Sequence, residues 1–170
     1  MAEAFIRQTG THVFLTGKAG TGKTSFLTRL QADCHKQMVV TAPTGVAAIN
    51  AGGVTLHSFF QLPFGPHIPG QSDRNRDYRR FFRFSKEKKR IIKGLDLLVI
   101  DEISMVRADL LDSVDAVLRR LRRDDRPFGG VQLLLIGDLF QLPPVAKPDE
   151  WQLLRNHYRS VYFFDSQALS

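Results

Sequence analysis

The sequence predicts an α/β fold in which a mostly parallel sheet lies between two layers of helices. Short apolar segments alternate with helical patterns along the chain, and these apolar segments show little alternation of polar and apolar residues. Strands of that composition are buried on both faces, as in a parallel sheet. A strand–helix alternation also favours right-handed crossover connections. The length of 170 residues suits one hydrophobic core, so residues 1–170 are expected to form a single domain.

The strands are expected at five segments rich in Val, Ile, Leu and Phe, namely residues 12–16, 38–41, 97–100, 132–136 and 161–164. Two further segments, residues 23–34 and 108–123, have apolar residues at helical spacing. The second of these has acidic residues in its first turn and arginines in its last, which suits the helix dipole. Together these segments give the strand–helix order that an α/β sheet requires.

The composition excludes several classes of protein. Apolar residues make up 43% of the chain and charged residues 24%, which is typical of a globular domain and not of a disordered or fibrous one. The single cysteine, Cys34, excludes an intramolecular disulfide framework and is expected to be a small buried apolar residue. No apolar run approaches the ~20 residues that span a bilayer, so no membrane partner is expected. These features indicate a cytoplasmic protein.

The positive charge is concentrated in one segment. Lysines and arginines exceed acids by seven in the whole chain, and residues 72–93 contain ten of the former and three of the latter. Such a concentration suggests a polyanionic partner such as nucleic acid, with a solvated basic helix as the alternative. The candidate phosphate contacts are Arg79, Arg80 and Arg83. If they contact phosphate, neutralising them should reduce the salt dependence of DNA binding.

Residues 62–96, which include this basic segment, are predicted to be an insertion in the α/β pattern. Residues 62–70 contain three prolines and two glycines and are expected to be a loop. The basic segment follows, and residues 62–96 are therefore interpreted as a loop plus a basic helical insertion. The aromatic residues within it are better explained by packing on the core than by base stacking. They are Tyr78, Phe81, Phe82 and Phe84.

Residues 17–24, Gly-Lys-Ala-Gly-Thr-Gly-Lys-Thr, match the phosphate-loop pattern G-x4-G-K-[ST]. Backbone N–H groups of such a loop surround phosphate oxygens, the lysine contacts the β- and γ-phosphates, and the following hydroxyl binds Mg²⁺. The loop follows an apolar strand and opens an amphipathic helix, as this mechanism requires. The expected nucleotide-binding residues are Gly17, Ala19, Gly20, Thr21, Gly22, Lys23, Thr24 and Ser25.

Two acids and a glutamine follow other expected strands. Asp101 and Glu102 come directly after residues 97–100, at the edge where α/β sheets bind ligands. Asp101 is expected to hold the Mg²⁺, together with Thr24, and Glu102 to orient and deprotonate an attacking water. Two adjacent acids favour hydrolysis by water over transfer to another hydroxyl. Gln141 follows the next strand and is expected to sense the γ-phosphate.

A third strand leads to candidate nucleic-acid contacts. Pro43 and Thr44 are typical of a helix start, where the N–H groups near Gly45 could hold a phosphate of nucleic acid. Simple capping of that helix by Thr44 is the alternative. Further along, His57 and Ser58 offer hydrogen-bond donors, although a lone histidine is more often structural than functional.

These blocks together resemble the PIF-type (petite integration frequency) DNA helicases of superfamily 1, the class that moves 5′ to 3′. The order and spacing of residues 14–24, 42–48, 97–104 and 137–145 are similar to motifs I, Ia, II and III of that family, and residues 57–69 are similar to its bacterial members. The resemblance implies a RecA-like phosphate-loop NTPase domain with ATP and Mg²⁺ as cofactors. It also implies DNA repair, recombination and telomere maintenance, in a bacterial nucleoid-associated protein.

The resemblance also implies roles for single residues. Lys23 would contribute to catalysis, Glu102 would activate water, and Gln141 would couple the γ-phosphate to movement. Single-stranded and forked duplex DNA would be the partners. The residues that would contact the single strand are Pro43, Thr44, Gly45, His57 and Ser58.

Members of the family have two motor domains, and the second supplies an arginine finger. No motif of a second motor domain follows residue 145. The chain is therefore expected to be the N-terminal motor domain of a larger helicase, nearly inactive alone, with its second motor domain in cis. The alternative functions are a stand-alone phosphate-loop ATPase acting as a nucleotide-dependent switch, an AAA-type ATPase or a nucleoside kinase. An AAA-type domain would place a polar sensor where Gly137 and Asp138 stand, and a kinase would not need Glu102.

Overall fold

The computed structural model describes residues 2–18, 20–69 and 84–170. Its sheet has five parallel strands in the order β1-β5-β4-β2-β3. The strands are β1 Val13–Thr16, β2 Met38–Ala42, β3 Val54–Thr55, β4 Leu97–Ile100 and β5 Gln132–Gly137. The helices are α1 Ala2–Gln8, α2 Lys23–Asp33, α3 Gly45–Asn50, α4 Leu56–Phe60, α6 Lys86–Lys93, α7 Ala108–Arg122 and α8 Pro148–Leu154. The predicted fold class is confirmed.

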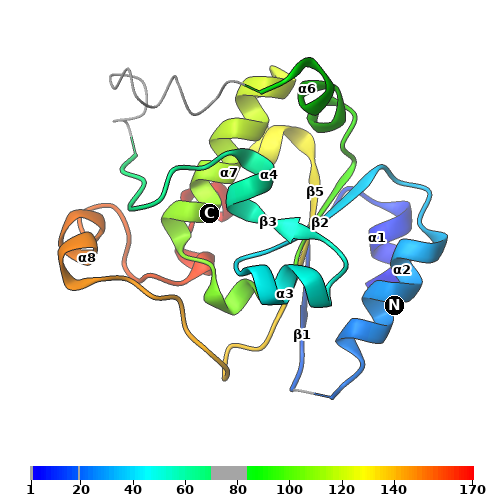
Figure 1. Ribbon diagram of the computed structural model, residues 1–170, viewed down its shortest axis with the longest axis horizontal. Helices are drawn as coiled ribbons and strands as arrows, with labels where there is room; N and C mark the ends of the chain where they lie inside the picture. The colour runs from blue at the N-terminus through cyan, green and yellow to red at the C-terminus, as the bar shows by residue number, and fades with distance from the viewer. Residues whose placement is uncertain (1, 19, 70–83) are drawn as a thin grey trace.

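Helices cover both faces of the sheet, with α1 and α2 on one side and α4, α6 and α7 on the other (Figure 1). Successive residues of β4 alternate between two core clusters, because adjacent side chains of a strand point to opposite faces. Leu98 and Ile100 pack into the cluster with α4, α6 and α7, whereas Leu97 and Val99 pack into the cluster with α1 and α2. Burial on both faces explains why this strand is apolar throughout.

Four of the five predicted strands are confirmed to within two residues, and the fifth is wrong. Residues 161–164 contribute one antiparallel bridge, between Tyr162 and Arg107, and then a 3-10 turn at Phe163–Asp165. Phe163 is buried and packs edge-on against Phe14 of β1, with 5.4 Å between the ring centroids. The apolar run therefore packs against the sheet instead of extending it.

A buried carboxylate on α7 anchors the C-terminal segment. Asp112 accepts hydrogen bonds from the Tyr158 hydroxyl at 2.7 Å, the Ser166 hydroxyl, and the backbone N–H groups of Gln167 and Ala168, each at 3.1 Å. Burial and this carboxylate raise the pKa of Tyr158 far above its ordinary value. Several donors thus compensate for the desolvation of one charge, which is the condition under which a buried carboxylate is tolerated.

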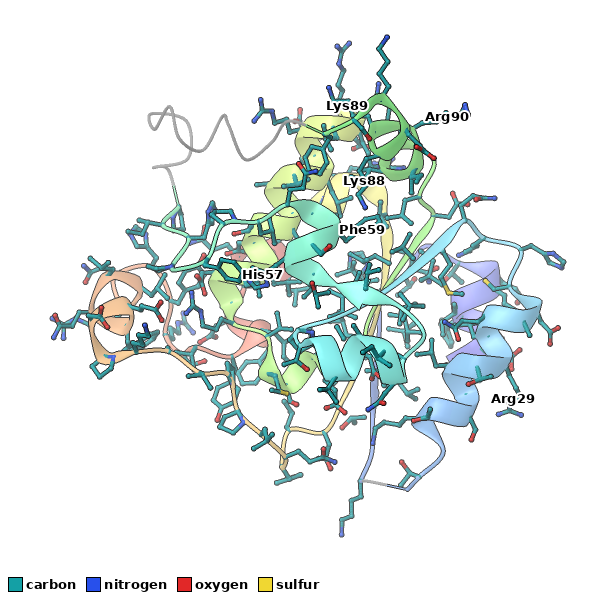
Figure 2. The ribbon with its side chains drawn as sticks, in the orientation of Figure 1. Arg29, His57, Phe59, Lys88, Lys89 and Arg90 are labelled. Atoms are coloured by element: carbon teal, nitrogen blue, oxygen red, sulfur yellow. The ribbon has the colours of Figure 1, made fainter. Side chains whose placement is uncertain are left out.

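The described part of the basic segment starts at Phe84, which is buried in the core, as predicted for the aromatic residues. Helix α6 follows. The Lys88 ammonium lies 3.9 Å from the centre of the Phe59 ring on α4, and Lys89 and Arg90 extend outward from α6 (Figure 2). The other predicted residues of this segment lie outside the described residues: Tyr78, Arg79, Arg80, Phe81, Phe82 and Arg83.

Two further predictions concern the burial of Cys34 and the presence of membrane-spanning helices. Cys34 is half-buried beside the cluster under α1 and α2, so the prediction of a buried apolar residue is confirmed only in part. Across the described ranges, no helix has both the length and the apolar character needed to cross a membrane.

Gly53, which precedes β3, approaches the backbone of β2 closely. A Cβ atom at this position would lie 2.2 Å from the Val40 carbonyl oxygen. Gly53→Ala is therefore expected to lower the free energy of unfolding by about 1–3 kcal/mol, the usual cost of overpacking. Denaturant unfolding would measure the change. Gly10→Ala, where a Cβ would meet open space, is the matched control, and equal stability of the two variants would contradict the prediction.

Candidate functional site

The carboxyl ends of four neighbouring strands bring the predicted groups to one edge of the sheet. Strand β1 leads into the phosphate-loop segment, β5 into Asp138 and Gln141, β4 into Asp101 and Glu102, and β2 into Thr44. All pairings are parallel, so these ends point the same way. Ligands of open α/β sheets bind at this edge.

In the phosphate-loop segment, the side chain of Lys23 hydrogen-bonds to backbone carbonyl groups of the same loop. Gly20 and Gly22 have φ angles of 78° and 88°, in the region that only glycine adopts without strain. Helix α2 begins immediately afterwards, at Lys23, whose ammonium donates to the carbonyl oxygens of Gly17 and, at 2.9 Å, of Lys18. Ala19 lies outside the described residues. The two glycines thus allow the turn that places the lysine at the helix N-terminus.

Asp101 and Glu102 leave β4 in a sharp turn. The Asp101 N–H donates to the Thr41 carbonyl at 2.8 Å, and the Asp101 carboxylate accepts from the Glu102 N–H at 3.0 Å. Glu102 has a φ of 51°. Burial is the main cause that raises the pKa of both acids, the Asp101 charge raises the pKa of Glu102 further, and Lys23 opposes both shifts. The lysine and the acids therefore act on one another electrostatically.

Asp138 orients the predicted sensor Gln141. The buried Asp138 carboxylate accepts from the Gln141 side-chain amide at 3.2 Å and from the Phe140 N–H at 3.0 Å. Sequence reasoning treated Asp138 only as evidence against an AAA-type domain and missed this contact. A signal was available, because Asp138 follows β5 as directly as Asp101 follows β4.

Five of the predicted residues line one cleft of about 360 Å³, here called the acid cleft. They are Thr24, Thr44, Asp101, Glu102 and Gln141. The Thr24 hydroxyl and the Asp101 carboxylate are hard oxygen donors of the kind Mg²⁺ prefers, and Mg²⁺ usually takes its remaining ligands from water and phosphates. Within the described ranges, no group of three or more His, Cys, Asp or Glu residues could hold a metal. The donor set fits a metal that a phosphate ligand shares.

Other residues of the phosphate-loop segment face a different hollow. Gly17, Thr21, Gly22 and Lys23 line a space of about 500 Å³ beside α1, together with Phe26 of α2. Ser25 is exposed in the first turn of α2. The loop therefore lies between this hollow and the acid cleft, with the lysine close enough to the acids to shift their pKa values.

A second groove, of about 400 Å³, adjoins the acid cleft and is here called the His57 groove. Its lining includes Pro43, Thr44, His57, Phe64, Pro143 and Lys147. Thr44 lines both spaces. Its hydroxyl accepts from the Ala47 N–H at 3.2 Å, so the capping interpretation of Thr44 is confirmed, while contact with DNA stays a prediction.

The other predicted DNA contacts differ in their surroundings. Burial is the main cause that lowers the pKa of His57, with a further contribution from the Arg107 charge, so the imidazole is neutral at pH 7. Ser58 is exposed on α4, outside the lining of the groove, and its N–H donates to the Thr55 hydroxyl at 3.2 Å. Gly45 is exposed at the start of α3. The structure therefore brings His57 to the groove but not Ser58.

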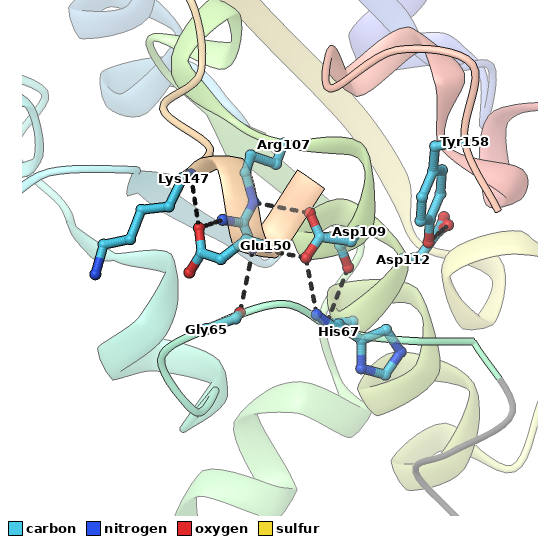
Figure 3. Close-up of polar contacts among 9 residues, drawn as sticks. Gly65, His67, Arg107, Asp109, Asp112, Lys147, Glu150 and Tyr158 are labelled. Atoms are coloured by element: carbon cyan, nitrogen blue, oxygen red, sulfur yellow. Dashed lines mark hydrogen bonds and ion pairs between the residues drawn. The ribbon is translucent and has the colours of Figure 1, made fainter. Parts of the chain in front are cut away.

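The Arg107 guanidinium lines the His57 groove. Figure 3 shows its hydrogen bonds to three neighbouring residues. Arg107 donates to Asp109 at 2.8 and 2.9 Å, to Glu150 at 2.9 Å, and to the Gly65 carbonyl at 3.2 Å. Asp109 also accepts from the His67 N–H at 2.8 Å. These contacts join the loop before the basic segment to the starts of α7 and α8, and sequence reasoning did not identify them.

The comparisons with known proteins agree with this arrangement. The family model described as PIF1-like helicase matches residues 1–163. The ATP-dependent DNA helicase PIF1 of Saccharomyces cerevisiae is 40% identical over 147 residues, which are 84% of this chain and 16% of that protein. The chain thus spans about a sixth of the length of this relative.

Solved structures show the same likeness. A structure of two coordinating Pif1 helicases at forked duplex DNA has a TM-score of 0.90 and 49% identity, covering 98% of this chain and 38% of that one. Two structures of Pif1 from Bacteroides, one in complex with ADP-AlF4 and one bound to single-stranded DNA, each have a TM-score of 0.88 and 49% identity, with coverages of 97% and 37%. A family model that matches nearly the whole described fold, with the phosphate-loop segment and the paired acids at one sheet edge, makes this chain a member of the PIF1-like helicase family.

Proposed function

We propose that this chain is an ATP-binding and ATP-hydrolysing motor domain of a DNA helicase that moves along single-stranded DNA and unwinds duplex. The observation that carries the proposal is the convergence of a phosphate-loop segment, two acids and a glutamine on one sheet edge. Lys23 lies within electrostatic reach of both acids, and Thr24, Asp101, Glu102 and Gln141 share the acid cleft.

The chemistry follows from the donor set. The Lys23 ammonium now binds two loop carbonyls, and a β- or γ-phosphate would replace them as a stronger, charged acceptor. Thr24 and Asp101 would hold Mg²⁺, which supplies charge neutralisation on the phosphates. Glu102, with its raised pKa, is suited to accept a proton from an attacking water. Gln141, oriented by Asp138, would contact the γ-phosphate region.

The segment after β5 offers a physical link between nucleotide and DNA. Gln141 and Leu142 line the acid cleft, whereas Pro143 and Val145, a few residues further along, line the His57 groove. A shift of this segment when the γ-phosphate leaves would therefore change the groove directly. Single-stranded DNA in the His57 groove would contact Thr44, which lines both spaces, and His57.

The length of the relatives supports a second motor domain in the parent protein, contributing an arginine finger. Such a finger raises turnover by about 10³–10⁵ in related phosphoryl-transfer systems. We therefore expect the 170-residue chain to bind Mg-ATP weakly, to hydrolyse it very slowly and not to unwind duplex. Rapid multiple-turnover hydrolysis by the purified chain would contradict this part of the proposal.

Nucleotide binding tests the site itself. Lys23→Ala is expected to weaken binding of a fluorescent ATP analogue about 10- to 100-fold, because one charge-assisted contact contributes about 1.5–3 kcal/mol. Equilibrium fluorescence titration with Mg²⁺ would measure it. Lys18→Ala is the matched control. Lys18 accepts hydrogen bonds from Thr21 and Lys23 through its backbone carbonyl, which the substitution keeps. Equal affinity of the two variants would contradict the assignment of Lys23.

A further inference from the structure

Phe64 is a large apolar side chain held in solvent at the mouth of the His57 groove. Its side chain is 91% exposed. One face of the ring stacks on His57 of α4, with 5.2 Å between centroids and 17° between the planes. The imidazole is neutral at pH 7, so the pair is an aromatic stack and not a cation–π contact. A single exposed apolar residue is ordinary, and the question is whether the fold fixes this one in place.

The loop that carries Phe64 is anchored from below. The carbonyl of the next residue, Gly65, accepts from Arg107, and the N–H of His67 donates to Asp109 (Figure 3). Asp109 is 1% exposed and Arg107 is 14% exposed. Removing either partner of such a buried pair would leave an uncompensated charge, so the contacts that hold the loop are costly to break. Phe64 is therefore exposed and positioned at the same time, which is the arrangement of a preorganised contact surface.

The groove beside the stack suits a planar apolar ligand with a phosphate attached. Pro43, Met105, Leu110 and Pro143 contribute apolar lining. The groove carboxylate, Glu150, is engaged by Arg107 and by the Lys147 N–H, so its charge is compensated. Lys147 adds a cationic side chain to the rim, and it is exposed. A nucleotide combines a base, which offers a π-face to the ring, with a phosphate for the cation.

We propose that Phe64, supported by His57, stacks with a nucleobase of single-stranded DNA. This inference rests on the proposed function and names the group that the groove recognises. It assigns to residues 62–69 a contact that tolerates any sequence, since every base has a π-face. The phosphates of the same strand are left to Lys147.

Binding of two matched strands tests the stack. The probes are a fluorescein-labelled oligothymidine and the same strand with abasic sites, measured by fluorescence anisotropy. Phe64→Ala is expected to weaken oligothymidine binding roughly 5- to 100-fold, the usual range for loss of one base–aromatic stack, while Phe64→Trp keeps it. The salt dependence should not change, because no phosphate contact is removed. On the abasic strand, wild type and Phe64→Ala should bind equally.

Phe164→Ala is the matched control. Phe164 is also an exposed phenylalanine stacked on another ring, with 5.3 Å between its centroid and that of Tyr162, but it lines neither the acid cleft nor the His57 groove. Equal oligothymidine affinity of the two alanine variants overturns the base stack and leaves the helicase proposal standing. An equal loss for Phe64→Ala on both strands also overturns it, because the contact is then not to a base. No binding of oligothymidine by wild type contradicts the proposed DNA groove as well.

Discussion

Glu102→Gln is expected to remove nearly all ATP hydrolysis by this chain while nucleotide binding stays intact. A positioned general base contributes about 10²–10⁴-fold to rate, and glutamine keeps the shape of the side chain but cannot accept a proton. Glu102 lines the acid cleft beside Asp101 and Thr24, and its backbone turn depends on a φ of 51° that glutamine also tolerates at similar cost. The expected loss of rate is therefore a chemical effect and not a change of fold.

The measurement is phosphate release in single turnover, with enzyme in excess, because the wild-type rate itself is expected to be slow. Binding of a fluorescent ATP analogue to the same samples separates binding from chemistry. Glu87 is an exposed glutamate in the first turn of α6 and does not line the acid cleft. Glu87→Gln makes the same chemical change there and should hydrolyse ATP at the wild-type rate. Wild-type hydrolysis by Glu102→Gln would exclude Glu102 as the base.

The parts of the fold that were predictable are those where one physical constraint dictates the residue type. Strand β4 is buried on both faces, so every position from Leu97 to Ile100 had to be apolar, and the segment was identified without ambiguity. The acid cleft was predictable for a related reason. Parallel strands end at one edge, so polar residues placed directly after β4 and β5 had to converge.

The wrong strand shows where this reasoning fails. Val161 and Phe163 are as apolar as the residues of β4, and composition alone does not tell a strand from a segment that packs against the sheet. What decided the outcome is tertiary structure: Asp112 on α7 binds the residues that follow, and Phe163 packs on β1. Neither contact has a signature in local spacing.

The His57 groove was only half predictable, for the same reason. His57 and Thr44 stand in recognisable segments, but Phe64 becomes notable only once its exposure is known. The Arg107 network could not be predicted from the sequence. Arg107 and Glu150 are 43 positions apart, and they come together only when α8 packs in the folded structure. Long-range ion pairs of this kind leave no periodic pattern to detect.

Arg107→Ala is expected to be the most destabilising of the variants considered, with a loss of about 3–5 kcal/mol in the free energy of unfolding. The substitution leaves the Asp109 carboxylate buried without its cation, and it removes the donor that holds the Gly65 carbonyl and Glu150. For a chain of this length the loss corresponds to a drop of roughly 6–20 °C in the midpoint of thermal unfolding. Circular dichroism during heating would measure it.

Arg126→Ala is the matched control, since Arg126 also pairs with an aspartate two positions away, Asp124, but on the surface. Exposed pairs contribute little, so its unfolding midpoint should equal that of wild type. The double variant Arg107→Met with Asp109→Asn should recover part of the loss, because the uncompensated charge is gone and the arginine stem is replaced by an apolar one. If Arg107→Ala unfolds at the same temperature as Arg126→Ala, the network does not hold the loop, and the position of Phe64 beside His57 has to be explained by the aromatic stack alone.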